Sequence, residues 1–96
     1  MACYFLAEIA VHDPALYRQY VEQASAIVPR YGGEYVFRSE AITPVSGGWA
    51  PARLLLIRFP SPDHLRRCFA DPEYLAIAPL RERSTTSRTV LIQDQG

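Results

Sequence analysis

The sequence contains no lysine: all ten of its basic residues are arginine, and ten acidic residues balance them. The absence of lysine excludes chemistry that needs a lysine amine, such as Schiff-base formation or phosphate binding by a P-loop lysine. A net charge of zero, with no run of one sign, also excludes the positive stripe that nucleic-acid binding requires. Arginine remains well suited to binding a carboxylate or phosphate, because its planar guanidinium donates two parallel hydrogen bonds.

Cysteine and histidine are scarce, with two of each. Cys3 and Cys68 are too few for a disulfide framework, so we expect two reduced, partly buried thiols. His12 and His64 lack any metal-binding spacing, and no metal site is expected. Neither G-x-S-x-G nor a phosphate-loop pattern occurs. We therefore expect no cofactor, and haem binding is a weak alternative because neither histidine has an obvious place facing a cavity.

Long hydrophobic runs are missing as well. Met1–Val11 is too short to span a membrane, carries Glu8, and lacks the basic leader of a signal peptide. We therefore expect a cytoplasmic protein without membrane contact. Ninety-six residues with 49% apolar and 21% charged residues have the composition of one folded domain, covering residues 1–96.

What the sequence does contain is one local pattern that occurs twice. An apolar strand meets Asp-Pro or Ser-Pro, becomes helical, and returns as a strand. The copies run from Tyr4–Val11 through Asp13-Pro14 to Glu34–Thr43, and from Arg53–Phe59 through Ser61-Pro62 to Arg88–Gln93. Asp or Ser before Pro starts a helix, because the side-chain oxygen caps free N–H groups and Pro at the first helical position lacks one. Two split β-α-β units predict an α+β fold, the ferredoxin-like β-α-β-β-α-β plait with an antiparallel sheet.

The spacing of apolar residues and of Pro and Gly sets the expected bounds of the helices. The first helix has an apolar stripe at Leu16, Tyr20, Ala24, Ile27 and Tyr31, with Pro29 disturbing its last turn and Gly32-Gly33 ending it. Later helices are expected from Ser61-Pro62 to Phe69 and from Asp71-Pro72 to about Arg83, followed by a polar connection over residues 84–87. Pro44–Pro51 is a long loop that carries the only tryptophan, Trp49.

The strands are apolar on both faces, as the runs Tyr4–Val11 and Leu54–Ile57 show. Alternation is expected where one sheet face meets water, and continuous apolar runs where both faces are covered. The helices of a plait cover only one face. A second copy of the chain is therefore expected on the other face, which predicts a homodimer.

Charged residues within these strands are candidates for a site. Arg38 follows an apolar run, Arg53 opens the leucine-rich strand, and Glu8 lies in the first strand. In a sheet of strand order 4-1-3-2, Glu8 and Arg53 become neighbours. The strand order leaves their register and face open: they form a structural ion pair, an edge exposed to water, or part of a positive floor for an anionic ligand. Six tyrosines, several of them on helices over the sheet, either fill the core or line a cavity.

Several of these residues occur in a familiar order. The motifs are Asp13-Pro14-x-x-Tyr17, Tyr31-Gly32-Gly33-x-Tyr35-x-x-Arg38, Trp49-x-Pro51-x-Arg53, Phe59-Pro60-Ser61, Asp71-Pro72-Glu73-Tyr74 and Pro79-x-Arg81. Over essentially the whole chain, this order resembles the domain-of-unknown-function family 1330. The resemblance implies a dimeric α/β barrel, in which two sheets pack face to face with the helices outside. It names no activity, because the wider superfamily contains cofactor-independent enzymes as well as simple ligand binders.

Carried over by motif position, the candidate ligand-binding residues are Tyr17, Arg38, Trp49, Arg53, Tyr74 and Arg81. The sequence departs from the usual pattern of that family at four places: Ser39-Glu40 after the strand arginine, Gly48 before Trp49, Arg58 before Phe-Pro-Ser, and Cys68-Phe69. We expect a small-molecule-binding protein for a compact anionic or aromatic compound, and whether it is a cofactor-independent enzyme stays open. The alternative is a non-catalytic dimeric interaction or assembly protein.

Overall fold

In the computed structural model, which describes residues 1–96, each helix begins at one of the predicted caps. Asp13 accepts a hydrogen bond from Leu16 N, Ser61 accepts one from His64 N, and Asp71 accepts from Glu73 N and Tyr74 N. A proline follows each cap at the first helical position, as the pairs Asp-Pro and Ser-Pro predict. The elements in chain order are β1 (Cys3–Val11), α1 (Pro14–Ile27), the 3₁₀ helix η1 (Val28–Tyr31), β2 (Glu34–Ser39), β3 (Leu54–Phe59), α2 (Pro62–Ala70), α3 (Pro72–Ser84) and β4 (Thr85–Gln93).

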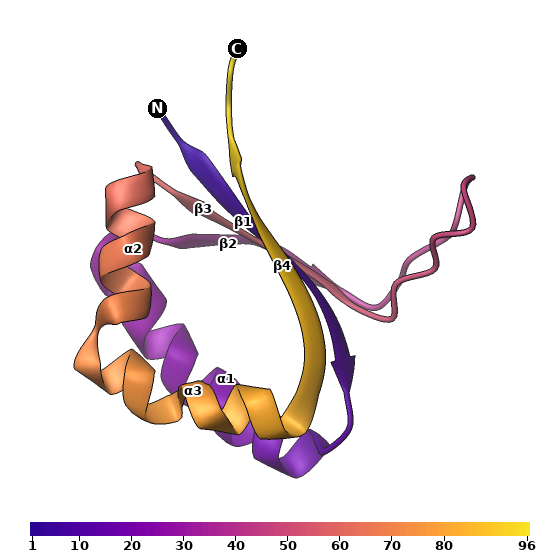
Figure 1. The fold of residues 1–96 in the computed structure, drawn as a ribbon, viewed down its shortest axis with the longest axis horizontal. Coiled ribbons are helices and arrows are strands. Elements are labelled where there is room, and N and C mark those ends of the chain that lie inside the picture. Colours follow the sequence, from indigo (N-terminus) through magenta and orange to yellow (C-terminus); the bar gives the residue numbers. More distant parts are fainter.

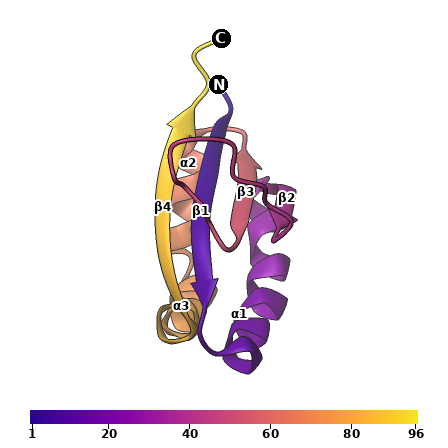
Figure 2. The same cartoon turned by 90° about the vertical axis from the view of Figure 1, so that its right-hand side faces the viewer.

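The four strands form one antiparallel sheet in the order β2-β3-β1-β4. All helices lie on one face of this sheet, and its other face carries no helix (Figure 1). Figure 2 shows this open face toward the viewer, with the loop between β2 and β3 standing off it. This is the ferredoxin-like α+β plait that the repeated pattern predicts. None of the helices has the length and apolar character that crossing a bilayer requires.

Strand alternation assigns each side chain of β1 and β3 to a face. Cys3, Ile9, Ile57 and Phe59 are at most 4% exposed and pack under the helices. The side chains that alternate with this inward set lie on the open face, and they include Tyr4, Leu6 and Glu8 on β1 and Leu54, Leu56 and Arg58 on β3. On β4 the same face carries Val90 and Ile92, with exposed fractions of 53% and 44%. Apolar side chains therefore lie on both faces of the sheet, as the sequence predicts.

Several predicted bounds are wrong. The strand expected over Glu34–Thr43 ends at Ser39, and the polar connection expected at residues 84–87 is instead the last residue of α3 and the beginning of β4. Polar residues extend β4 because its register with β1 continues to Val11↔Thr85. The first helix ends at Ile27 and continues as η1, since Pro29 cannot donate a hydrogen bond to the α-helical ladder. Its buried side also includes Tyr17, which the predicted stripe omitted.

The glycine pair after η1 serves two different purposes. Gly32 has φ of 77° and ends the 3₁₀ helix in the left-handed region. Gly33 is needed for space, because an added Cβ would lie 2.4 Å from Val28 Cγ1 and 2.9 Å from Phe59 Cε1. Val28 and Phe59 are both core residues, so neither can move away easily.

We predict that Gly33→Ala lowers the free energy of unfolding by about 2–3 kcal/mol, as overpacking of a filled core does. Gly47→Ala is the matched control, because its added Cβ meets nothing within 4 Å and only the positive φ of 79° causes strain. We expect a loss of about 1 kcal/mol for that variant. Chemical denaturation measures both, and equal losses would show that the contact at Gly33 is not the cause.

Candidate functional site

Two small cavities lie between the helix-facing side of the sheet and α1. One encloses about 30 Å³ and is lined by aromatic and aliphatic side chains together with Arg38. The other encloses about 20 Å³ and has a polar wall formed by Arg81, Ser87 and Thr89. Both cavities share Phe5, Tyr17, Tyr20 and Leu55 in their walls. Each is large enough for a water molecule, and neither reaches the roughly 150 Å³ that holds a benzene ring.

An open cleft of about 400 Å³ adjoins these cavities at the beginning of α1. Its walls include Tyr17, Glu40 and Arg53. Tyr17 is the one side chain that borders the cleft and both cavities. Its ring stacks on Tyr20, which borders both cavities, at a centroid distance of 6.1 Å, so Tyr17 is a wall that the cleft and the cavities share. We call the cleft and the two cavities together the helix-side site.

The arginines of the helix-side site differ in their partners. Arg53 forms an ion pair with Glu40, and its guanidinium carbon lies 5.2 Å from the centre of the Tyr17 ring. Arg38 has no carboxylate partner, and its guanidinium carbon lies 4.3 Å from the centre of the Tyr35 ring. Arg81 also lacks a carboxylate partner and donates a hydrogen bond of 3.2 Å to Tyr74 OH. Arg38 and Arg81 therefore contact a tyrosine ring or a tyrosine hydroxyl, and no carboxylate balances their positive charge.

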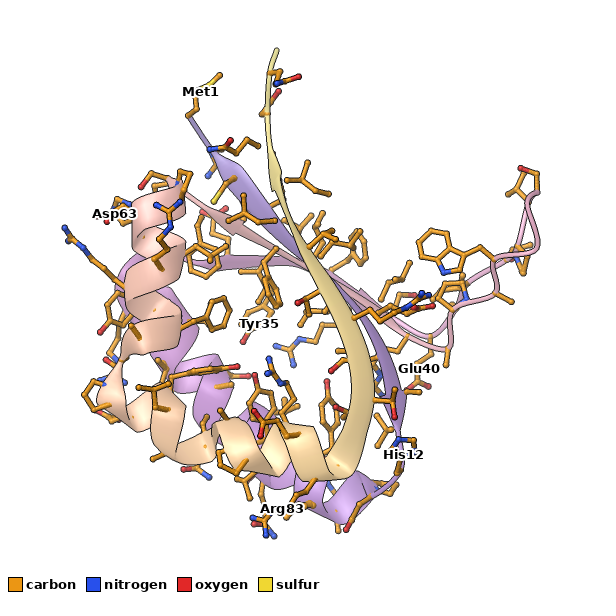
Figure 3. The ribbon with its side chains drawn as sticks, in the orientation of Figure 1. Met1, His12, Tyr35, Glu40, Asp63 and Arg83 are labelled. Atoms are coloured by element: carbon orange, nitrogen blue, oxygen red, sulfur yellow. The ribbon has the colours of Figure 1, made fainter.

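A β-bulge brings Arg38 to this side. Tyr35 pairs with Ile57, Phe37 with Leu56 and Arg38 with Leu55, so the register shifts by one residue between Tyr35 and Phe37. Because of that extra residue, Tyr35 and Arg38 lie on the same face although three positions separate them. Figure 3 shows Tyr35 in the space between the sheet and the helices. Burial raises the pKa of the Tyr35 phenol, which keeps this group protonated at neutral pH.

Tyrosine hydroxyls complete the polar lining. Tyr20 OH and Tyr74 OH lie 2.9 Å apart, and Arg81 reaches the same Tyr74 oxygen. Tyr74 is 4% exposed, and no buried side-chain polar atom of the structure lacks a hydrogen-bond partner. The sequence-based set omitted Tyr20 and Tyr35. The spacing of three between Tyr17 and Tyr20 on one helix was the signal that could have placed Tyr20 beside Tyr17.

Five of the six sequence-predicted residues belong to this region: Tyr17, Arg38, Arg53, Tyr74 and Arg81. Trp49 lies on the opposite face of the sheet, where its Nε1 donates a 2.9 Å hydrogen bond to Glu8. Arg88 Nε binds the other oxygen of the same carboxylate at 2.7 Å. Trp49, Glu8 and Arg88 border a separate open cleft of about 330 Å³ together with Leu6, Leu54 and Val90. Trp49 therefore does not close over the helix-side site of its own chain.

Glu8 and Arg53 are neighbours in the sheet, as the strand order predicts, but their side chains do not meet. Glu8 pairs with Leu54 in the β1–β3 ladder, so the two side chains share the open face. Arg53 precedes Leu54 and points to the helix side, where it meets Tyr17. Alternation along the strand thus separates two charges that are adjacent in the sheet.

Hydrogen bonds from Trp49 and Arg88 lower the pKa of Glu8 below its usual range. The ionised form of Glu8 therefore stabilises the fold above the ordinary glutamate pKa, and this contribution is lost as the pH falls through the lowered value. We predict that the fluorescence of Trp49 stays constant down to about pH 4.3, the ordinary pKa of glutamate, and changes below it. Glu8→Ala should shift the emission at neutral pH and remove this pH dependence, whereas Glu34→Ala should do neither. A change centred at or above the ordinary glutamate pKa would contradict this assignment.

The buried cysteines are not part of the helix-side site. Cys3 and Cys68 are free and lie in the main core cluster. Burial raises the pKa of the Cys68 thiol to about 11, so the thiol is protonated and unreactive at neutral pH. No group of three His, Cys, Asp or Glu side chains is placed to hold a metal ion.

These observations define a ferredoxin-like α+β protein with an aromatic, arginine-containing space between its sheet and its helices. The chain belongs to the family described as Domain of unknown function (DUF1330), which matches residues 2–95. The comparison with curated proteins finds no match.

Solved structures share the fold at low sequence identity. A protein of unknown function from Rhodopseudomonas palustris has a TM-score of 0.82 at 16% identity, over 99% of this chain and 83% of that one. SnoaB, a cofactor-independent oxygenase from Streptomyces nogalater, has a TM-score of 0.71 at 20% identity, over 99% of this chain and 94% of its own. A dimeric ferredoxin-like protein of unknown function from Jannaschia sp. CCS1 has a TM-score of 0.73 at 14% identity, over 98% of this chain and 100% of its own.

Proposed function

We propose that this chain is a homodimeric small-molecule-binding protein whose helix-side site takes a compact aromatic compound that carries an anionic group. The observation that carries the proposal is the pair of arginines, Arg38 and Arg81, which border aromatic cavities without a carboxylate partner. A guanidinium at the wall of an apolar cavity suits an aromatic anion, because it donates charge-assisted bidentate hydrogen bonds to the anionic group while the ring contacts the apolar wall.

Entry of a ligand requires movement of side chains. The enclosed cavities of about 30 and 20 Å³ hold water but not an aromatic ring. Tyr17 is the side chain between them and the open cleft, and it is held by stacking on Tyr20 and by the Arg53 guanidinium. A ligand carboxylate can replace the exposed Glu40 as the ion-pair partner of Arg53. The contact of Arg53 with the Tyr17 ring is then released. Displacement of the Tyr17 ring then joins the cleft to the inner cavities.

The homodimer is proposed on the open face of the sheet. Leu6, Leu54, Leu56, Val90 and Ile92 make this face apolar, and no element of the chain covers it. Two of its charged groups are paired, since Arg88 binds Glu8, and Arg58 lies at the end of β3 near its edge with the loop to α2. Such a face suits a second copy of the chain, and the structural neighbours from Jannaschia and Bacteroides fragilis are described as dimeric. The loop that carries Trp49 would then lie against the partner.

A titration with benzoate tests the proposal, because benzoate combines a compact ring with a carboxylate. We expect saturable binding, with chemical-shift changes in ¹H–¹⁵N spectra at residues that border the helix-side site, such as Tyr17, Tyr35 and Leu55. Ethylbenzene, which has similar size and no charge, should bind more weakly. A lack of saturable binding, or changes confined to the open face of the sheet, would contradict the proposal and favour the alternative of an interaction or assembly protein.

A more specific proposal is that the protein is a cofactor-independent enzyme. The likeness in fold to SnoaB supports it, as do the tyrosine hydroxyls that can donate a proton inside the site. Oxygen consumption by EDTA-treated protein in the presence of catechol, hydroquinone or 1-naphthol tests it. Consumption that depends on the protein and falls in Tyr20→Phe supports an oxygenase, and rates equal to the buffer control speak for ligand binding alone.

A further inference from the structure

The hydroxyls of Tyr20 and Tyr74 and the guanidinium of Arg81 form a chain whose direction can be derived. Arg81 Nη1 lies 3.2 Å from Tyr74 OH, and Tyr74 OH lies 2.9 Å from Tyr20 OH. A guanidinium only donates hydrogen bonds, so the Tyr74 oxygen accepts from Arg81. The hydroxyl hydrogen of Tyr74 then needs an acceptor of its own.

The Tyr20 oxygen is the one acceptor that lies within reach of this hydrogen. Tyr74 is 4% exposed, and its hydroxyl makes no other hydrogen bond than those to Arg81 and Tyr20. Leaving its hydrogen unpaired in a buried place would cost about 1–3 kcal/mol. Tyr74 therefore donates and Tyr20 accepts, and the hydrogen of Tyr20 remains free.

That free hydrogen belongs to a side chain that borders both enclosed cavities. No other side chain or backbone group of the chain bonds to Tyr20 OH. In the unliganded protein the hydrogen has room to bind a water, since the cavities enclose about 30 and 20 Å³. Burial raises the pKa of Tyr20 well above its ordinary value, so this phenol stays protonated and does not act as a base near neutral pH.

We propose that Tyr20 is the specificity-determining donor of the helix-side site, and that it selects ligands carrying a carbonyl or carboxylate oxygen next to an aromatic ring. Arg81, acting through Tyr74, is a positioning residue that fixes the direction of the donor. The inference rests on the proposed function and adds to it a second, uncharged point of recognition beside the guanidinium of Arg38.

The test compares two uncharged probes of similar size, acetophenone and ethylbenzene, because only acetophenone has an oxygen acceptor. We expect Tyr20→Phe to weaken acetophenone binding about fivefold, the effect of one lost neutral hydrogen bond, and to leave ethylbenzene binding unchanged. A purely structural effect of the substitution would weaken both probes alike. Tyr31→Phe is the matched control, because its hydroxyl binds Asp71 away from the cavities.

The carbonyl stretch of ¹³C-labelled acetophenone provides a second readout that needs no variant. A hydrogen bond from Tyr20 holds the frequency of the bound probe below its value in an apolar solvent, and Tyr20→Phe should remove this shift. Tyr74→Phe should make the shift smaller, since the direction of the donor is then no longer fixed.

Several results would overturn the inference, and only one of them overturns the proposed function as well. If the wild type binds neither benzoate nor acetophenone, the proposed function fails together with the inference, whereas binding of benzoate without acetophenone overturns the inference alone. If the wild type binds acetophenone, and Tyr20→Phe binds it with unchanged affinity and carbonyl frequency, only the inference fails. A wild type that binds both probes equally, without a frequency shift, likewise overturns the role of Tyr20 alone.

Discussion

Leu56→Glu is expected to turn the protein into a folded monomer, whereas Leu55→Glu is expected to unfold it. The two residues are adjacent in β3, but Leu55 packs against both core clusters under the helices and Leu56 lies on the open face. A glutamate at position 55 places a charge among apolar groups and removes leucine packing, with a loss of at least about 3 kcal/mol. A glutamate at position 56 is exposed to water in the monomer but would face apolar side chains of the partner in the dimer. The substitution therefore favours the monomer without unfolding it.

Sedimentation velocity and circular dichroism together separate these outcomes. The wild type should sediment as a dimer at micromolar concentration, and Leu56→Glu should sediment as a monomer with an unchanged far-ultraviolet spectrum. Leu56→Ala is the matched control, since it removes bulk without adding charge and should weaken the dimer less. A wild type that sediments as a compact monomer, or an unfolded Leu56→Glu variant, would contradict the assignment of the open face as the interface.

Arg38→Leu is expected to weaken benzoate binding at least about tenfold while changing the free energy of unfolding by less than about 1 kcal/mol. The guanidinium has no carboxylate partner in the protein, so its removal breaks no ion pair. Its contact with the Tyr35 ring is a cation–π interaction at a site exposed to water, which contributes about 0.5–1 kcal/mol.

Arg38→Lys separates the effect of the positive charge from the effect of the planar guanidinium geometry. Lysine keeps the charge but loses the planar pair of donors, so benzoate binding should weaken to a value between those of the wild type and of Arg38→Leu. Arg66→Leu is the control, because Arg66 is an exposed arginine on α2 away from the cavities. Calorimetric titration and thermal unfolding give the two quantities. Full affinity in Arg38→Leu, or a severe loss of stability in Arg38→Lys, would make Arg38 a structural residue.

Most of the fold could be predicted from local chemistry. The caps Asp13, Ser61 and Asp71, each followed by proline, fix where the helices begin, because capping and proline act within a few residues. The end of β2 and the beginning of β4 could not be predicted in this way. Thr85 belongs to a strand only because β4 pairs with β1 as far as Val11, which is a contact between distant parts of the chain.

The sequence predicted which residue types form the candidate site, but it did not predict on which face of the sheet each side chain lies. The bulge after Tyr35 decides that Arg38 points toward the helices, and nothing in the local residues marks that bulge. Strand alternation places Arg53 on the helix side and Glu8 on the other, which required the β1–β3 register. Trp49 was assigned to the site from motif order, and its loop instead carries it to the open face.

The measurement that tests the account most directly is a titration of the protein with benzoate, followed through the Nε–H signals of its arginines in ¹H–¹⁵N spectra. Arg38 and Arg81 should shift and saturate with one common dissociation constant, while the signals of Arg66 and Arg83, on exposed faces of α2 and α3, should stay in place. Equal small drifts of all arginines, or shifts confined to the exposed ones, would contradict an anion-binding site between the sheet and the helices.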